Sequence, residues 1–305
     1  MNRDILSNIF KKLDVVDVIM GASRVCITWF LASHDRTIWN TIKLNDPDSI
    51  LLDYPHGQHM QDNDGEKQQE YPLRKILVEL NKFGRTVPIN FFFNMRCNIL
   101  DEDLAIISKR MPNIRKLALP IMKPLDLNSI QSAFSKWKNL ETLIISPFTL
   151  HDNAFIPELK TIGDNCRNLT TMKFHCSLYK DLAKILVCNF PSLERLSFRC
   201  GCVCRESTIS LIIGHPNLKI LNLSHCIFTQ LQRDGGNLVS GMKPKEELLK
   251  TGTQKLEKFM LCCPEDCTIC QDTWKYTISP PRHKPEFHNF WEKQWKTDEI
   301  KDFEF

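Results

Sequence analysis

The chain has 305 residues and a formal net charge of +4, which is too small an excess to indicate a nucleic-acid-binding protein. It contains no run of about 18 apolar residues, so we expect no segment that spans a membrane. Its first residues also lack the apolar stretch of a secretion signal. We therefore expect the 13 cysteines to be reduced thiols in a protein of the nucleus or cytoplasm.

Residues 1–45 predict a small all-helical module. Apolar side chains recur at helical spacing from Ile5 to Leu13, and a second apolar helical pattern runs from Val15 to Val25. About 45 residues are too few for a robust core of their own. We therefore expect this module to pack against another part of the chain.

Residues 46–71 form a polar stretch that includes Gly57, Gly65 and a run of Asp, Asn and Gln. Such a composition, without apolar periodicity, favours a linker or a surface loop. We place a domain boundary on each side of it.

One short phrase then returns six times, beginning at positions 113, 139, 168, 192, 217 and 255. The copy Asn217-Leu-Lys-Ile-Leu-Asn-Leu223 shows its form, x-L-x-x-L-x-L. Recurrence of this phrase at roughly 20–29 residues is the signature of leucine-rich repeats. Each copy predicts one short strand whose alternate apolar residues enter a core shared with neighbouring repeats, because no repeat can bury its apolar face alone.

The predicted fold class is therefore α/β. Residues 72–263 form a leucine-rich-repeat solenoid of short parallel strands with helices outside. Residues 264–305 leave the repeat pattern, and we expect them to form a C-terminal cap or tail over the last repeat.

The amino-terminal module resembles an F-box, because the string from Asp4 to Leu13, then Val25-Cys26-x-x-Trp29, then Ile38-Trp39 occur in that order. The whole layout resembles a plant F-box/leucine-rich-repeat protein. The resemblance implies a Skp-type adaptor as partner and, through it, a cullin. It also implies an adaptor-binding surface, formed or supported by Ile5, Leu6, Ile9, Leu13, Val25, Cys26 and Trp29. The family usually opens this motif with Leu-Pro, where Met1-Asn2 stand here.

The residues between the core leucines of each strand are expected to face the concave side of the solenoid. In two adjacent repeats they are Lys173 with His175 and Arg195 with Arg199, and no acidic residue lies among them. Either this is a solvated face, or it receives an acidic or phosphorylated segment of a protein substrate, to which Arg gives paired hydrogen bonds.

The cysteines invite a zinc interpretation, with Cys263, Cys267 and Cys270 as the best candidate ligands. The structural alternative is a column of small buried residues at the strand ends, which needs no metal. We favour the latter and expect neither a metal nor another cofactor.

No P-loop, dinucleotide-binding, HExxH or GxSxG motif occurs, so we expect no catalytic activity. The sequence thus predicts the non-catalytic substrate-recognition subunit of an SCF-type cullin ubiquitin ligase, whose repeats bind an unknown protein substrate for ubiquitination. The alternative is an adaptor-independent leucine-rich-repeat scaffold with a degenerate F-box. A small-molecule sensor is a weaker alternative, because so short a solenoid leaves little room for an enclosed pocket.

Overall fold

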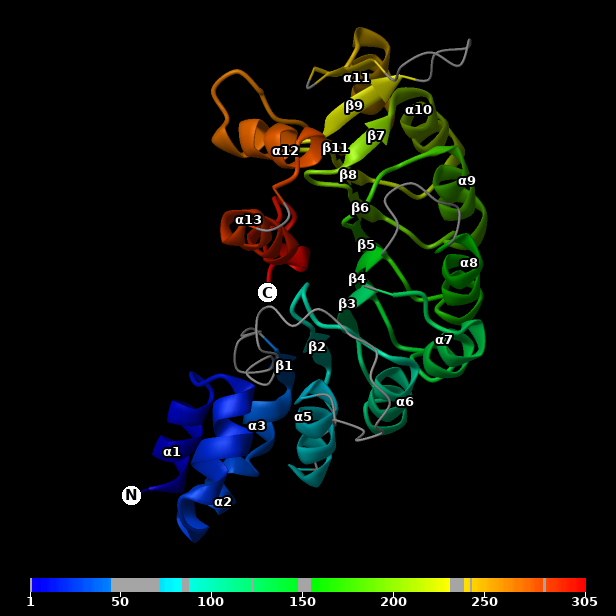
Figure 1. The fold of residues 1–305 in the computed structure, drawn as a ribbon. Coiled ribbons are helices and arrows are strands. Elements are labelled where there is room, and N and C mark those ends of the chain that lie inside the picture. Colours follow the sequence, from blue (N-terminus) through cyan, green and yellow to red (C-terminus); the bar gives the residue numbers. More distant parts are fainter. Residues whose placement is uncertain are drawn as a thin grey trace, which may run out of the picture.

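The structure is a computed structural model that describes residues 2–44, 72–83, 88–121, 123–147, 155–230, 239–241, 243–281 and 284–305. The predicted linker, residues 46–71, lies outside the described residues. Figure 1 shows a helical amino-terminal module at one end of a curved repeat array, with the C-terminal helices on the array's inner side. Within the described residues, no helix combines the length and the apolar character that crossing a membrane requires.

The amino-terminal module consists of three short helices and an irregular turn. Its helices are α1 (Arg3–Phe10), α2 (Ile27–Ser33) and α3 (Arg36–Trp39), and a π-helical turn (Asp17–Gly21) and a 3₁₀ turn, η2 (Ala22–Arg24), lie between α1 and α2. Asn2 begins α1, because its side chain accepts a hydrogen bond from the Asp4 amide. Leu6 and Phe10, four residues apart, lie on its buried face.

This module packs against the repeats, as its small size predicts. Strand β1 (Thr41–Lys43) follows α3 directly and pairs in parallel with β2 (Asn90–Phe92) of the repeat sheet. Trp39 is fully buried, and its ring lies 4.9 Å from that of Phe83 between centroids. The two parts of the chain therefore share one apolar core.

Among the described residues, eight strands form one parallel sheet with neighbours in chain order. After β1 and β2 these are β3 (Lys116–Ile121), β4 (Thr142–Pro147), β5 (Thr171–Phe174), β6 (Arg195–Ser197), β8 (Ile220–Asn222) and β11 (Lys258–Met260). The intervening helices α5 (Pro72–Leu80), α6 (Asp101–Arg110), α7 (Leu127–Phe134), α8 (Ile156–Asn165), α9 (Lys180–Asn189), α10 (Arg205–Gly214) and α11 (Glu246–Lys255) line the outer side, with a 3₁₀ turn, η3 (Asn81–Phe83), after α5.

The repeat phrase sets the register of this sheet. Its central leucine position forms one continuous ladder across six strands: Leu117, Leu143, Met172, Leu196, Leu221 and Phe259. These side chains enter the main core or pack against it, together with the inner faces of the helices. The predicted α/β solenoid of parallel strands with helices outside is confirmed.

A second, smaller sheet flanks the last repeats. Strands β7 (Cys202–Cys204), β9 (Ile227–Gln230) and β10 (Val239–Gly241) form it in the order β10-β9-β7, with β9 parallel to β7 and antiparallel to β10. It extends the turns that follow β6 and β8, and so widens that end of the solenoid.

Helix α12 (Thr268–Ile278) follows the last repeat, and α13 (Pro285–Lys296) and a 3₁₀ turn, η5 (Lys301–Phe303), end the chain. We call residues 284–305 the C-terminal strap. It does not stay over the last repeat, where we expected a cap. Instead it runs back along the inner side of the sheet, where the indole N–H of Trp295 donates to the Phe93 carbonyl, 2.9 Å away beside β2.

Candidate functional site

Two surfaces of this fold are candidates for function, and the first is an apolar face of the amino-terminal module. Leu6 and Phe10 point into the core, so the residues one position before each lie on the outer face of α1. There Ile5 is 52% exposed, and Ile9 is also exposed. Leu13, three residues past the end of the helix, adds a third exposed apolar side chain.

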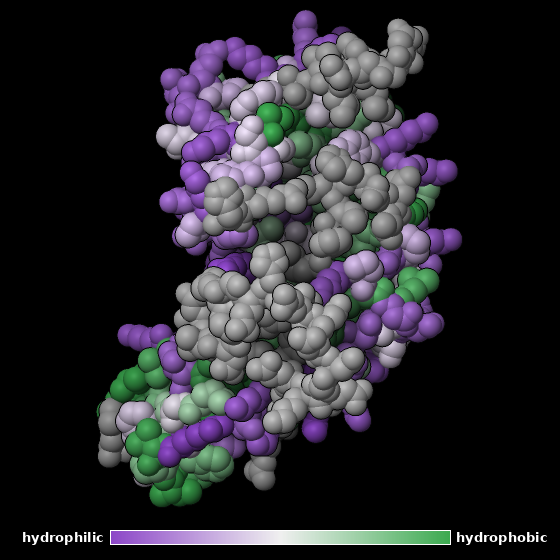
Figure 2. Space-filling view, in the orientation of Figure 1, coloured by the Kyte–Doolittle hydropathy of each residue, from purple (hydrophilic) through white to green (hydrophobic). Residues whose placement is uncertain are grey.

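The start of α2 extends this face. Val25 is 62% exposed and Ile27 is 70% exposed, and Phe30 and Leu31 are exposed one turn later. Helices α1 and α2 pack directly on each other. Figure 2 shows hydrophobic side chains concentrated over this end of the molecule. A cluster of large apolar side chains in water is costly and is typical of a binding surface.

The second candidate is the inner, concave face of the sheet, and the C-terminal strap covers it. A separate apolar cluster joins Trp295, Ile300 and Phe303 of the strap to residues of three neighbouring strands, Phe92, Ala118 and Ile144. The ring of Phe305 stacks on Phe92 with centroids 4.6 Å apart. Alternation along the strands explains the division, because Leu117 and Leu119 enter the main core while Ala118 faces the strap.

Lys173 of β5 lies in the middle of this contact and is 0% exposed. Its ammonium donates to three carbonyls at the end of α13: Gln294 at 2.9 Å, Trp295 at 3.3 Å and Thr297 at 2.7 Å. The C-terminal end of a helix attracts a cation, because its last carbonyls lack partners in the helix. Burial lowers the pKa of Lys173 to about 8, although the nearby Asp298 carboxylate acts in the opposite direction.

Asp298 of the strap completes this site. Its Oδ2 lies 3.4 Å from the Lys173 ammonium and accepts a hydrogen bond from the Ser197 hydroxyl at 2.7 Å. Its Oδ1 accepts from the amide of Asn222 at 2.8 Å. Three consecutive strands thus hold one buried carboxylate, which defines where the strap can lie.

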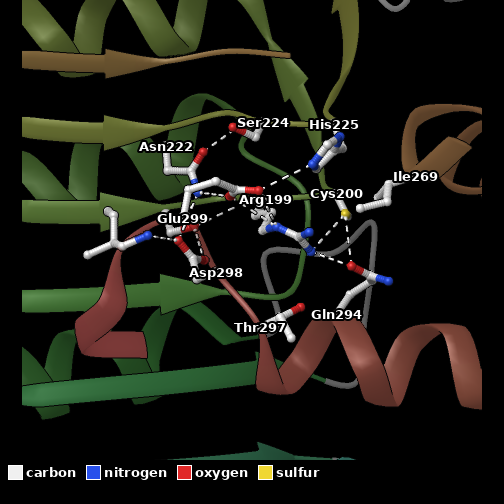
Figure 3. Close-up of polar contacts among 12 residues, drawn as sticks. Arg199, Cys200, Asn222, Ser224, His225, Ile269, Gln294, Thr297, Asp298 and Glu299 are labelled. Carbon is white, nitrogen blue, oxygen red and sulfur yellow. Dashed lines mark hydrogen bonds and ion pairs between the residues drawn. The ribbon is translucent and has the colours of Figure 1, made fainter. Parts of the chain in front are cut away.

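Two arginines continue the polar contact, and Figure 3 shows the contacts of one of them, Arg199. The Nε of Arg199 lies 3.0 Å from both carboxylate oxygens of Glu299, and its Nη1 donates to the side chain of Gln294. Arg195 forms an ion pair with Asp302. Burial alone would raise the pKa of Glu299, but the hydrogen bond from His225 and the charge of Arg199 hold it well below its ordinary value.

His175 lies beside Lys173 but contacts aromatic rings instead of acids. Its ring meets that of Trp291 edge to face, with centroids 5.0 Å apart, and Trp295 at 6.3 Å. Its Nε2 is buried and has no hydrogen-bond partner among the described residues. Burial, and then the charges of Lys173 and Arg199, lower the pKa of His175 to about 3. The imidazole is therefore neutral at physiological pH.

Comparison with known proteins identifies the family. No family model matches the chain. An F-box protein of Arabidopsis thaliana is 37% identical over 341 residues, which cover 100% of this chain and 95% of the relative. The chain belongs to the F-box/leucine-rich-repeat proteins. An F-box/LRR-repeat protein of the same plant is 28% identical and covers 98% of the chain and 94% of its own length.

Among solved structures, the leucine-rich-repeat-containing protein LegL7 of Legionella pneumophila aligns with 82% of this chain and 79% of its own length, at 10% identity and a TM-score of 0.40. A similarity this low supports no conclusion here. The resemblance to plant F-box/leucine-rich-repeat proteins rests on the Arabidopsis relatives and is confirmed by them.

The structure sorts the residues predicted for the F-box surface into two groups. Ile5, Ile9, Leu13, Val25 and Cys26 are exposed. Leu6 is only 1% exposed, and Trp29 is partly buried, with its ring 5.4 Å from Phe10. For Leu6 an adaptor-facing position is wrong, because it lies on the inner face of α1, and only the supporting role remains.

The same surface contains residues that sequence reasoning missed, namely Ile27, Phe30 and Leu31. Their spacing of three and four residues was a usable signal, because it places all three on one side of a helix. The exposed apolar surface therefore extends beyond the V-C-x-x-W string.

The prediction of an open basic patch on the concave face of this F-box/leucine-rich-repeat protein is wrong in the described structure. Lys173, His175, Arg195 and Arg199 do lie close together, but each contacts the protein's own strap. No acid was visible among neighbouring strand positions because the acids come from residues about a hundred positions away. The available signal was a set of three acids, Asp298, Glu299 and Asp302, close to apolar residues near the end of the chain.

Proposed function

We propose that this F-box/leucine-rich-repeat protein is the substrate-recognition subunit of an SCF-type cullin ubiquitin ligase. The observation that carries the proposal is the exposed apolar face formed by α1 and α2. F-box proteins generally bind Skp-type adaptors, and an apolar face of this kind suits a helical protein partner. In this proposal the adaptor covers Ile5, Ile9 and Val25, together with their neighbours on the two helices.

In this function the protein carries out no reaction itself. The F-box connects it, through the adaptor, to a cullin in the nucleus or cytoplasm, and the repeats hold a protein substrate. Holding the substrate beside a ubiquitin-charged enzyme raises the effective concentration of its lysines, which is how a non-catalytic subunit accelerates transfer.

The test is direct binding of a purified Skp-type adaptor to the full chain, measured by calorimetry. The variant Ile5→Glu/Val25→Glu places two charges on the proposed surface and leaves the core intact, because both side chains are exposed. One interface anchor contributes about 2 kcal/mol or more, so the loss of even one of the two should weaken binding at least about 30-fold.

Ile213→Glu is the matched control, because Ile213 is 59% exposed on α10, away from the F-box. It should bind the adaptor as the unaltered chain does. Equal binding by the Ile5→Glu/Val25→Glu variant would show that the adaptor does not use this face. If the unaltered chain does not bind, the adaptor-independent scaffold becomes the better account.

A further inference from the structure

Four metal-ligating side chains meet where the last repeat joins α12, and the proposed function makes no use of them. They are His225, Cys262, Cys267 and Cys270, and one ligand atom from each lies within 4.8 Å of all the others. His225 and Cys270 are buried, whereas Cys262 and Cys267 are partly exposed. The cluster therefore has an inner side fixed by packing and an outer side that solvent ions can reach.

The repeat fold determines where these residues lie. His225 is three residues past β8, in a turn where its φ is 61°, and Cys262 is two residues past β11. Because β8 and β11 pair in register, both residues leave the sheet at the same edge. Cys267 begins α12 and Cys270 lies in its first turn, so a C-x-x-C pair faces them from the helix.

The distances suit a tetrahedral zinc ion. The Nδ1 of His225 lies 3.3 Å from the sulfur of Cys270 and 3.3 Å from that of Cys267. Zinc bonds of about 2.3 Å to sulfur and about 2.0 Å to nitrogen, at the tetrahedral angle, separate a nitrogen from a sulfur ligand by about 3.5 Å. Only small side-chain movements are needed for all four atoms to reach one ion.

The hydrogen bonding of His225 is an independent observation that points to a metal. Its Nε2 lies 3.2 Å from the carboxylate of Glu299, which is a hydrogen-bond acceptor. In a neutral imidazole Nε2 therefore carries the proton, and the Nδ1 lone pair is left on the side of Cys267 and Cys270. A carboxylate that accepts from the outer nitrogen of a metal-bound histidine is the usual support of such sites.

Cys263 does not belong to this cluster, although the sequence favoured it as a ligand together with Cys267 and Cys270. It is exposed, and Cys262 takes its place. Met260, two residues before Cys262, packs against the strap cluster, and alternation along the strand continues this concave side to Cys262 and not to Cys263. The sequence favoured a column of buried residues at the strand ends over a metal, and three of these four residues lie outside that column.

We propose that His225, Cys262, Cys267 and Cys270 bind one zinc ion as a structural site that fastens α12 to the last repeat. Four protein ligands fill a tetrahedral shell and leave no open position for a substrate. Because Glu299 of the strap holds His225, the ion also supports the strap where it crosses the concave face.

The first measurement is the zinc content of the full chain, purified with a reductant and without a histidine tag, by mass spectrometry of the metal. We expect one zinc per chain. Replacing it with Co²⁺ should give the visible absorption of a tetrahedral ion with thiolate ligands. A zinc-free chain that also gives no such spectrum with excess Co²⁺ overturns the proposal, as does a disulfide among the three cysteines under these conditions.

Two serine variants locate the site. Cys262→Ser should lower zinc affinity by at least about tenfold, as removal of a ligand requires. Cys263→Ser, its neighbour and matched control, should keep full zinc content. The opposite pattern would contradict the assignment, and circular dichroism of both variants shows whether lost zinc reflects lost folding.

Discussion

Trp295→Ala tests whether the C-terminal strap is held by a contact that is energetically separate from the repeat core. The indole is fully buried in the strap cluster, and its N–H donates to the Phe93 carbonyl. Truncating a buried Trp costs about 3–5 kcal/mol, and an unpaired buried carbonyl adds about 1 kcal/mol. Since Trp295 belongs to the strap cluster and not to the main core, most of this loss falls on the strap.

Hydrogen exchange measured by mass spectrometry resolves the two parts. A loss of about 3 kcal/mol in the free energy of local opening speeds exchange about 100-fold. We expect this acceleration for amides of α13 and residues 297–305, and little change in α7 to α10. Trp291→Ala is the matched control, one turn earlier on the same helix and only partly buried, and it should have a smaller effect.

Two outcomes would refute this reasoning. If exchange in α13 is unchanged, Trp295 is not the anchor that its burial indicates. If exchange accelerates equally in α7 to α10, the strap and the repeats unfold as one unit and the two apolar clusters are not separable.

Three further predictions concern residues at the contact between the strap and the sheet. The folded pKa of His175, about 3, lies below its unfolded value of about 6.5, so stability is lost as pH falls through 6.5. Between pH 7 and pH 5 this should remove about 2 kcal/mol, measured by urea unfolding, and His175→Phe should remove much of that dependence. Glu299→Gln should weaken zinc binding about 10–100-fold in a chelator competition assay. Lys173→Met should cost about 3–5 kcal/mol in urea unfolding, because it leaves a buried carboxylate unpaired.

The controls for these variants come from the same surface. Asp302→Asn changes a strap acid that pairs with Arg195 and does not touch His225, so it should leave zinc affinity unchanged. Lys258→Met changes an exposed strand lysine and should stay within about 0.5 kcal/mol of the unaltered chain. A pH dependence that His175→Phe does not alter would assign the effect to other groups.

The solenoid was predictable because its repeat phrase is local. The leucine spacing within one copy, such as 217–223, fixes a strand and its buried side without knowledge of any distant residue. The inner face of α1 was less certain, because Ile5 and Leu6 are equally apolar and only packing shows which is buried.

The strap and the metal cluster depend on contacts that a local pattern does not contain. Lys173 pairs with Asp298, which lies more than a hundred residues later in the chain. The local sequence around either residue does not indicate its partner. Cys262 and Cys263 are adjacent residues after β11, and only the three-dimensional path of the backbone shows that Cys262 is the one that reaches the cluster. The sequence did contain the chemistry of both sites, as basic strand positions and as a C-x-x-C pair.

The pairing of β1 with β2 sets the orientation of the F-box relative to the repeats. Residues 45–71 connect Leu44 to α5, yet β1 and the buried Trp39 already fix the F-box to the first repeat. The length of that connection therefore does not set the direction in which the repeats point. If the F-box binds an adaptor and the repeats bind a substrate, as proposed, this pairing sets the direction from one to the other, and insertions in the connection should leave that direction unchanged.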